Sequence, residues 1–348
     1  MMERNVYEHY GIYINGSFKA GDYTGFSDGN SMYLLVPDLS QQPDEWEDKL
    51  SWAEQLRWLG DESIAVFVSP YTREYSVPVD GEKQLLFQVV PPKSAEGRNL
   101  NQEGTMLGDF HKRGMNLFPH AAPRPFSDRW CDWWETRLEQ LETWYSNVRK
   151  KTTYSPMDKW FLQTFPYYIG RTENAIQWLK ETSWQVENRE EPGCITHFCF
   201  TSKTWVTLDQ HSPPVKLPSD WLYDHPSRDV AEWIRHAMEE EKRENEIYDF
   251  LHNYEQKNEL SGFGRKLVLG RLLFPYYYME QLEQTYLREN TGGQEDALKK
   301  LQLLWEKESD RIKQLSALFP SFLPRKEEMP KWLTGTVTSS FYPSNKLL

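Results

Sequence analysis

The sequence predicts an α+β protein in which a small strand-rich unit, residues 1–92, precedes a larger helical part, residues 93–348. Two observations support this prediction. Short apolar runs separated by turn residues dominate the first part of the chain, whereas apolar residues recur at spacings of three and four from Asn101 onward. The 15 Trp, 19 Tyr and 17 Phe residues supply the apolar area that a globular core needs.

The N-terminal unit combines strands with one helix. Strands are predicted over residues 10–14, 17–26, 32–36, 64–68 and 85–90, and the Asp28-Gly29 turn joins the second and third into a hairpin. Apolar residues at helical spacing from Trp46 to Leu59 predict a helix that ends at Gly60. The pair Pro91-Pro92 ends the last strand.

The second part is predicted to be helical over residues 102–114, 127–151, 155–182, 227–259, 262–289 and 294–317. The segment that opens at Ser127 places Trp130, Trp134 and Leu138 on one apolar face, with Trp133 at its margin. We expect this face to pack in the core; an exposed aromatic binding stripe is the alternative. Extended chain is predicted from Gly193 towards Asp224.

Charge and targeting signals restrict the classes of partner. The net charge of −12 has the wrong sign for binding phosphates, so nucleic acid is not an expected partner. The start of the chain lacks the apolar run of a secretory signal, and no stretch approaches the ~20 apolar residues of a membrane span. We therefore expect synthesis in the cytoplasm and no membrane span. The three cysteines favour reduced thiols.

Common catalytic fingerprints do not occur in the sequence: it has no phosphate-binding glycine loop, no H-E-x-x-H and no G-x-S-x-G. A zinc site at Cys194, His197 and Cys199 would need a fourth ligand, and His211 lies across a proline-rich loop. A thiolate nucleophile at Cys199 is a second alternative, but positions 197 and 199 of a strand share a face by geometry alone. We expect no metal site and no catalytic cysteine.

Three segments carry a resemblance to a known family. They are Gly104–Gly114 (GTMLGDFHKRG), Ile195–Phe200 (ITHFCF) and Tyr223–Arg235 (YDHPSRDVAEWIR). In this order they resemble the aminoglycoside and choline phosphotransferase group, and within it the spore-coat-associated kinase-like proteins of the CotS type. The resemblance implies a protein-kinase-like two-lobed fold with a strand-rich N-lobe, residues 1–92, a helical C-lobe, residues 93–348, and a degenerate catalytic loop near residues 195–224.

The resemblance also shows where the catalytic residues depart from the family's pattern. Active members carry H-G-D-x-x-x-x-N in the catalytic loop, where Asp accepts the substrate proton and Asn holds Mg²⁺. This register gives His197, Phe198 in place of Gly, Cys199 in place of Asp and Thr204 in place of Asn. The strand lysine that pairs with phosphates is replaced by Val36, and no spacing favours Lys19 as a substitute.

Two aspartates match the remaining motifs less directly. Asp220 aligns with the metal-binding aspartate only through an insertion and a deletion, and Asp229 fits the family's arginine-aspartate motif or, alternatively, caps a helix. The resemblance thus implies a catalytically dead protein of the spore coat, without cofactor or metal, whose partners are other coat proteins and whose small-molecule ligand is unknown. It leaves two alternatives open: a binding module, and an active small-molecule phosphotransferase with an atypical site.

Overall fold

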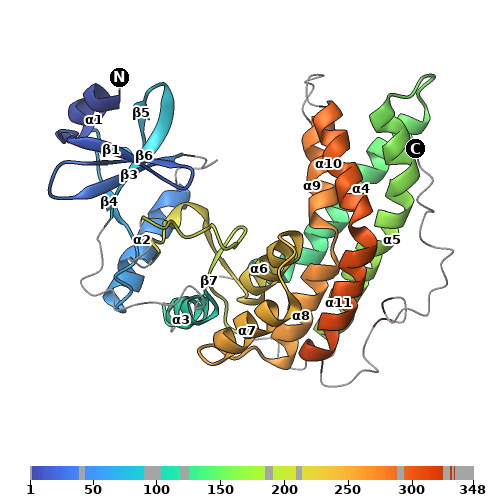
Figure 1. Ribbon diagram of the computed structural model, residues 1–348. Coiled ribbons are helices and arrows are strands. Elements are labelled where there is room, and N and C mark those ends of the chain that lie inside the picture. Colours follow the sequence, from blue (N-terminus) through green and yellow to red (C-terminus); the bar gives the residue numbers. More distant parts are fainter. Residues whose placement is uncertain are drawn as a thin grey trace. The chain divides into compact units, whose positions relative to one another are not determined.

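The structure, a computed structural model, describes residues 2–38, 44–89, 103–117, 125–184, 191–208, 214–287, 294–323, 330 and 333 (Figure 1). The chain divides into two compact units, which are described separately. The first contains Met1–Pro125, Pro192–His236 and Asn245–Glu259, and the second contains Phe126–Glu191, Ala237–Glu244 and Leu260–Leu348. The division into lobes at residue 92 stays a prediction.

Six strands among the described residues form an antiparallel sheet in the order β1-β2-β3-β6-β4, with β5 paired to β6. Their bounds are β1 Gly16–Ala20, β2 Tyr23–Ser27, β3 Met32–Pro37, β4 Val66–Val68, β5 Val77–Val79 and β6 Glu82–Val89. Helix α1 (Met2–Tyr10) precedes the sheet, and α2 (Asp44–Trp58) connects β3 to β4.

The hairpin and helix predictions for this unit are confirmed, while two strand predictions are wrong. Asp28 accepts the backbone N–H groups of Asn30 and Ser31 through Oδ1, at 2.8 and 2.7 Å, and so closes the β2–β3 turn. Tyr10 belongs to α1, which ends where Gly11 adopts a φ of +69°, and residues 11–15 are irregular. The stretch 17–26 is two strands, since Gly21, with φ of +58°, reverses the chain. Strand β5 was not predicted.

The two faces of the sheet carry separate apolar clusters, as the alternation of side chains along a strand requires. One cluster contains Phe26, Leu35 and Leu86 together with residues of α1. The other, which we call the inner cluster, contains the following buried residues: Ala20, Leu34, Val36, Trp46, Ala65, Leu85, Phe87, Val89, Val206, Val215 and Leu217. The last three come from a segment more than a hundred residues beyond the sheet.

The rest of the first unit consists of α3 (Glu103–Met115), the β7–β8 hairpin (Cys194–His197 and Trp221–Asp224) after the short helix η3 (Pro218–Asp220), α6 (Ser227–Glu239) up to His236, and α7 (Glu244–Glu255). Glycines bring α3 close to its neighbours. A Cβ at Gly104 would lie 2.2 Å from the carbonyl oxygen of Phe250 in α7, and one at Gly114 would lie 2.9 Å from the backbone nitrogen of Ile195 in β7. Side chains at these two positions would force the elements apart.

The second unit is helical. It contains η2 (Phe126–Arg129), α4 (Trp130–Arg149), α5 (Pro156–Trp184), α8 (Gly262–Leu273), α9 (Tyr276–Leu287), α10 (Gln294–Glu306) and α11 (Glu308–Phe322). Three predicted long helices are each two shorter ones. The breaks fall before Pro275, at Lys307, and near Glu241, whose φ is +56°.

The aromatic face of α4 is buried, as predicted. Trp130, Trp134 and Leu138 lie in the core, and Trp134 stacks on Phe274 with ring centroids 4.3 Å apart. Trp133 is half-buried. None of the helices in the described part of the chain combines the length and the apolar character of a membrane crossing. The predicted stop at Pro91-Pro92 lies outside the described residues.

Candidate functional site

The β7–β8 hairpin positions most of the predicted site residues. His197 is the last residue of β7 and pairs with Trp221 at the start of β8. The next backbone N–H, that of Phe198, donates to the carbonyl oxygen of Asp220 at 2.8 Å. This bond holds the stretch that leads to Cys199 beside Asp220. The structure therefore brings together the two segments that the sequence separates by about twenty residues.

Asp229 links the hairpin to α6. Its carboxylate accepts the backbone N–H of His197 at 2.9 Å and the Nδ1–H of the same residue at 2.7 Å. Both side chains are fully buried. Asp229 does not cap α6, because the helix has already begun at Ser227. Its role is to hold the end of β7.

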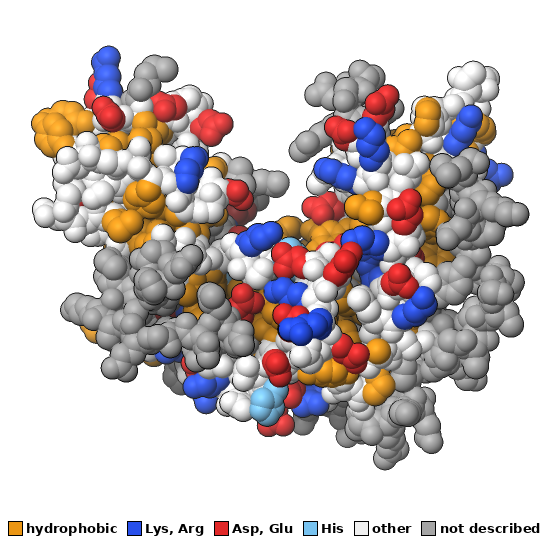
Figure 2. Space-filling view, in the orientation of Figure 1, with side chains coloured by type: hydrophobic (Ala, Val, Ile, Leu, Met, Phe, Trp, Pro, Cys, Tyr) orange, Lys and Arg blue, Asp and Glu red, His pale blue; other side chains and the backbone are white. Residues whose placement is uncertain are grey.

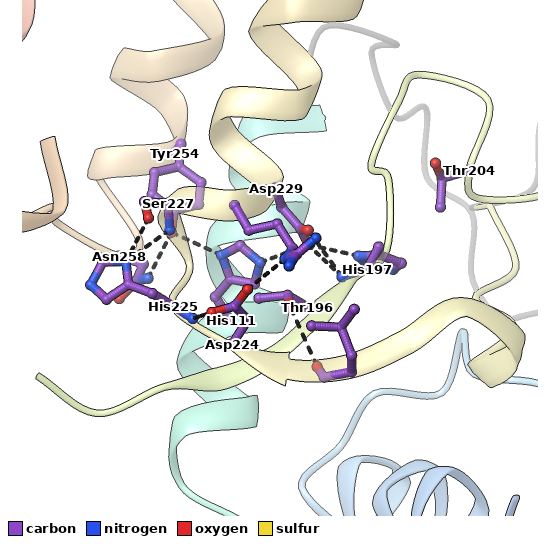
Figure 3. A network of polar contacts seen from close by, with 12 residues as sticks. His111, Thr196, His197, Thr204, Asp224, His225, Ser227, Asp229, Tyr254 and Asn258 are labelled. Atoms are coloured by element: carbon purple, nitrogen blue, oxygen red, sulfur yellow. Dashed lines mark hydrogen bonds and ion pairs between the residues drawn. The ribbon is translucent and has the colours of Figure 1, made fainter. Parts of the chain in front are cut away.

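A second histidine completes this network, and sequence reasoning missed it. His111 in α3 contacts Asp229 Oδ2 through Nε2 at 3.0 Å and the hydroxyl of Tyr254 in α7 through Nδ1 at 2.9 Å. Asn258 donates to the same hydroxyl at 2.8 Å. Figure 3 shows this network around Asp229, with His111 from α3, His197 from β7, and Tyr254 and Asn258 from the C-terminal end of α7 and the residues just after it. His111 lies in the quoted Gly104–Gly114 segment, which was the one available signal.

The donors and acceptors of this network have one consistent arrangement. Trp205 can only donate, and its Nε1–H points at His197 Nε2 at 3.0 Å, so that nitrogen carries a lone pair and the ring proton sits on Nδ1. Tyr254 donates to His111 Nδ1, and His111 Nε2–H donates to Asp229. Hydrogen bonds are thus donated in series from Asn258 to Tyr254, to His111 and to Asp229. A second series runs from Trp205 to His197 and ends at the same carboxylate.

Burial and charge shift the pKa values of the ionisable groups in this network. Burial opposes the charge of Asp229, but the two histidines outweigh it and hold its pKa far below the usual range. Burial lowers the pKa of His111. The pKa of His197 is raised, because the opposing effect of burial is outweighed by the Asp229 carboxylate. Asp229 is therefore an anion whose oxygens are occupied by protein donors.

Arg228 holds the chain on the other side of the hairpin. Its Nε donates to Asp224 Oδ2 at 2.5 Å, and its Nη1 donates to the carbonyl oxygen of Phe198 at 3.2 Å. The backbone of Phe198 is therefore bonded through both its N–H and its carbonyl, while its ring is 60% exposed. Phe198 is therefore held at its backbone and presents an apolar side chain at the surface.

Cys199 and Thr204 occupy the loop after β7. Thr204 Oγ1 accepts the backbone N–H of Thr201 at 2.8 Å and donates to the carbonyl oxygen of Cys199 at 3.2 Å, so the hydroxyl closes the turn. Thr204 lies away from the histidine network (Figure 3). Cys199 is half-buried, and Cys194 is fully buried, with its thiol pKa raised well above normal by burial. Cys194 is therefore a protonated thiol.

Val36 lies on the inner face of β3 and is 1% exposed. It belongs to the inner cluster together with Val206 and Leu217, which flank the candidate site in sequence. Lys19, considered as a substitute for the missing lysine, lies on β1, where its Nζ donates to Thr24 on the exposed surface at 2.8 Å. Val36, which the resemblance placed at the lysine position, therefore packs against hydrocarbon.

A different lysine lies near Asp220. Lys49 of α2 donates to the carbonyl oxygen of Ser219 at 2.8 Å. Burial raises the pKa of Asp220, against the opposing effects of His197 and Lys49. No group of three or more His, Cys, Asp and Glu side chains suited to a metal ion occurs within the described ranges. Sequence reasoning did not identify Lys49.

Comparisons with known proteins identify the family and the fold. The family model described as "Spore coat putative kinase YutH" matches residues 3–318. The chain is 31% identical over 293 residues to the endospore coat-associated protein YutH of Bacillus subtilis (strain 168), covering 82% of this chain and 84% of that protein.

Two solved structures have a similar fold. The aminoglycoside phosphotransferase of Alicyclobacillus acidocaldarius matches with a TM-score of 0.63 and 14% identity, over 89% of this chain and 91% of that one. A spectinomycin phosphotransferase solved with ADP and spectinomycin matches with a TM-score of 0.54 and 11% identity, over 87% and 93%. The predicted kinase-like α+β fold and the family resemblance are thus confirmed, and the chain belongs to the spore coat YutH family of kinase-like proteins.

Proposed function

We propose that this chain is a catalytically degenerate kinase-like protein of the endospore coat, acting in coat assembly or function as a scaffold or binding module. Its family and a relative that is itself endospore coat-associated support the coat context. Its partners are then other coat proteins. On the face shown in Figure 2, the described acidic and basic side chains are interspersed, which does not favour a nucleic-acid partner.

The observation that carries the proposal is the environment of Val36. Phosphoryl transfer in this fold needs a strand lysine whose ammonium pairs with the nucleotide phosphates. Val36 offers a hydrocarbon side chain inside the inner cluster, where a cation would lose its hydration without gaining a partner. Lys49 is the nearby cation, and its ammonium is held by a backbone carbonyl of the protein itself.

The residues that match the family's proton acceptor and metal ligands also support a catalytically degenerate site. A thiol at Cys199 is a weak acceptor, and a thiolate prefers soft metals to Mg²⁺. The hydroxyl of Thr204 closes its own turn, and the oxygens of Asp229 are occupied by protein donors, which leaves Asp220 as the remaining family-matched carboxylate among the described residues. Those residues hold no group of three or more His, Cys, Asp and Glu side chains suited to a metal ion. These residues do not fit a magnesium–nucleotide complex.

Coat fractionation tests this function. The tagged chain is expressed during sporulation as the wild type and as the single variants Cys199→Ala and Asp220→Ala, with Asp310→Ala as the control for an exposed carboxylate. We expect all four in the coat fraction in equal amounts. Loss of both Cys199→Ala and Asp220→Ala from the coat, with circular dichroism showing both folded, would contradict the scaffold proposal.

A turnover assay distinguishes the proposed function from the alternative, an active phosphotransferase. Purified wild-type protein is incubated with Mg-ATP and a panel of amino-alcohol and aminoglycoside acceptors, and ADP is measured. We expect no acceptor-dependent ADP. Acceptor-dependent turnover would establish the alternative, an active small-molecule phosphotransferase with an atypical site, because phosphoryl transfer without these groups requires another way to stabilise the transition state.

A further inference from the structure

Residues 214–220, which we call the linking segment, lead into β8 and run along the edge of the sheet unit. The backbone of Lys216 bonds in both directions to the chain just before β4. Its N–H donates to the carbonyl of Ser63 at 2.9 Å, and its carbonyl accepts from the N–H of Ala65 at 3.0 Å. This parallel bridge between Ile64 and Lys216 joins the linking segment to the sheet unit by main-chain bonds.

A buried ion pair lies at the same place. Lys216 Nζ is 2.5 Å from Asp61 Oδ2, and each side chain is 4% exposed. The rings of Phe110 and Trp205 lie 5.3 and 4.8 Å from the ammonium group. Burial opposes the charge of Asp61, but Lys216 outweighs it and lowers the pKa of the carboxyl. Asp61 also contacts the partly exposed Arg113, whose Nη1 lies 3.3 Å from Oδ2, so Lys216 is the buried cation of a carboxylate that two cations share.

Further contacts extend the same connection along the linking segment. Val215 and Leu217 pack in the inner cluster with Leu34 of β3. Beyond them, the carbonyl oxygen of Ser219 accepts a hydrogen bond from Lys49 of α2. Figure 1 shows this part of the chain, in yellow, beside α2. The linking segment thus bonds to α2 and to the chain before β4.

We propose that the buried Asp61–Lys216 ion pair fastens the sheet to the linking segment, so that the sheet and the β7–β8 hairpin open together as one body. The proposal goes beyond the proposed function and does not depend on it, since it concerns how two parts of the chain are joined. The two parts also belong to one compact unit of the chain.

The physical reason is the asymmetry of buried ion pairs. Removing one partner leaves a buried charge without compensation, whereas removing both charges together is close to neutral. Asp61→Asn leaves the buried ammonium group of Lys216 without a compensating negative charge. We expect this variant to reduce the folded-to-open ratio by roughly a hundredfold. The double variant Asp61→Asn with Lys216→Met leaves no buried charge without a partner, because the remaining cation, Arg113, is 35% exposed, and it is expected to recover most of that loss.

Native-state hydrogen exchange of the full-length chain, without nucleotide, tests the connection. We compare amides of residues 63–68 with those of residues 214–222. In the wild type the two groups should exchange with the same opening equilibrium, and Asp61→Asn should accelerate both by the same factor. The matched control is Glu62→Gln, since Glu62 is the exposed neighbour of Asp61; it should change neither group.

Two outcomes would overturn the inference. One is different opening equilibria for the two groups in the wild type, because the two parts would then open separately with the ion pair intact; separate exchange that appears only in Asp61→Asn would instead show that the pair had joined them. The other is unchanged exchange of both groups in Asp61→Asn. If Asp61→Asn does not fold, the double variant is measured in its place. The double variant should fold, and its amides should exchange within about tenfold of the wild-type rates. A double variant that is also unfolded would contradict the ion-pair mechanism. Nucleotide binding by the wild type would contradict the proposed function but not this coupling.

Discussion

Replacing Asp229 with alanine removes the centre of the buried histidine network. The carboxylate accepts three donors: the backbone N–H and Nδ1–H of His197, at 2.9 and 2.7 Å, and Nε2–H of His111 at 3.0 Å. All three donors stay buried when it is removed. A buried donor left without a partner costs about 1–3 kcal/mol, and breaking a buried charged contact costs about 3–5 kcal/mol in total. We expect the free energy of unfolding to fall by about 3–5 kcal/mol, a large part of an ordinary domain's ~5–15 kcal/mol.

Urea unfolding, followed by tryptophan fluorescence and far-ultraviolet circular dichroism, measures this loss. The matched control is Asp109→Ala on the same helix as His111, where the carboxylate makes a half-exposed ion pair with Lys257 at 3.6 Å. Such a pair contributes less than about 1 kcal/mol. A loss in Asp229→Ala no larger than that of the control would refute the reasoning, because the network would then not hold β7 in place.

Four further predictions follow from the same structure. The pKa of Asp229 is held below its usual range in the folded protein, so the ionised carboxylate stabilises the fold fully above the unfolded-chain pKa of about 4. This stabilisation is lost progressively as the pH falls from about 4 towards the folded pKa. Urea unfolding between about pH 3 and pH 7 should show this loss of stability in the wild type and much less of it in Asp229→Ala. Trp134→Ala should cost about 3–5 kcal/mol in the same unfolding assay and the half-buried Trp133→Ala less, and equal losses would contradict the assigned core face. Val36→Lys should lower the melting temperature without creating nucleotide binding, since the ammonium enters the inner cluster; a stable, ATP-binding variant would show that the cluster opens readily. Cys199→Asp alone should leave phosphotransfer undetectable, because the missing groups act together, and turnover by this single variant would show that the rest of the site is intact.

The sequence was sufficient where the signal is local. The Asp28-Gly29 turn, the helix that ends before Gly60 and the buried face around Trp134 each depend on residues a few positions apart. The family segment at residues 223–235 also marked Asp229. Local patterns failed at residues 10–14, where an apolar, aromatic run follows a short helix and forms no strand.

The partners of the site residues could not be read from local patterns. His111 lies 118 positions from Asp229 and 143 from Tyr254, and neither separation has a periodic signature. Lys216 and Asp61 are 155 positions apart. Charged side chains that read as solvated in sequence become buried when the fold supplies the opposite charge, so the role of Asp229 as the anchor of β7, instead of a helix cap, needed the three-dimensional structure.

Binding of Mg-ATP to the wild-type protein tests the central claim most directly. A ligand that binds the folded state stabilises it by RT ln(1 + [L]/Kd), which is about 2.7 kcal/mol at a hundredfold excess over Kd. We titrate ATP to millimolar concentration with and without Mg²⁺ and follow the melting temperature. The degenerate site predicts no saturable rise in either series. A saturable, magnesium-dependent rise in melting temperature would contradict it and would mean that this chain retains a working nucleotide site.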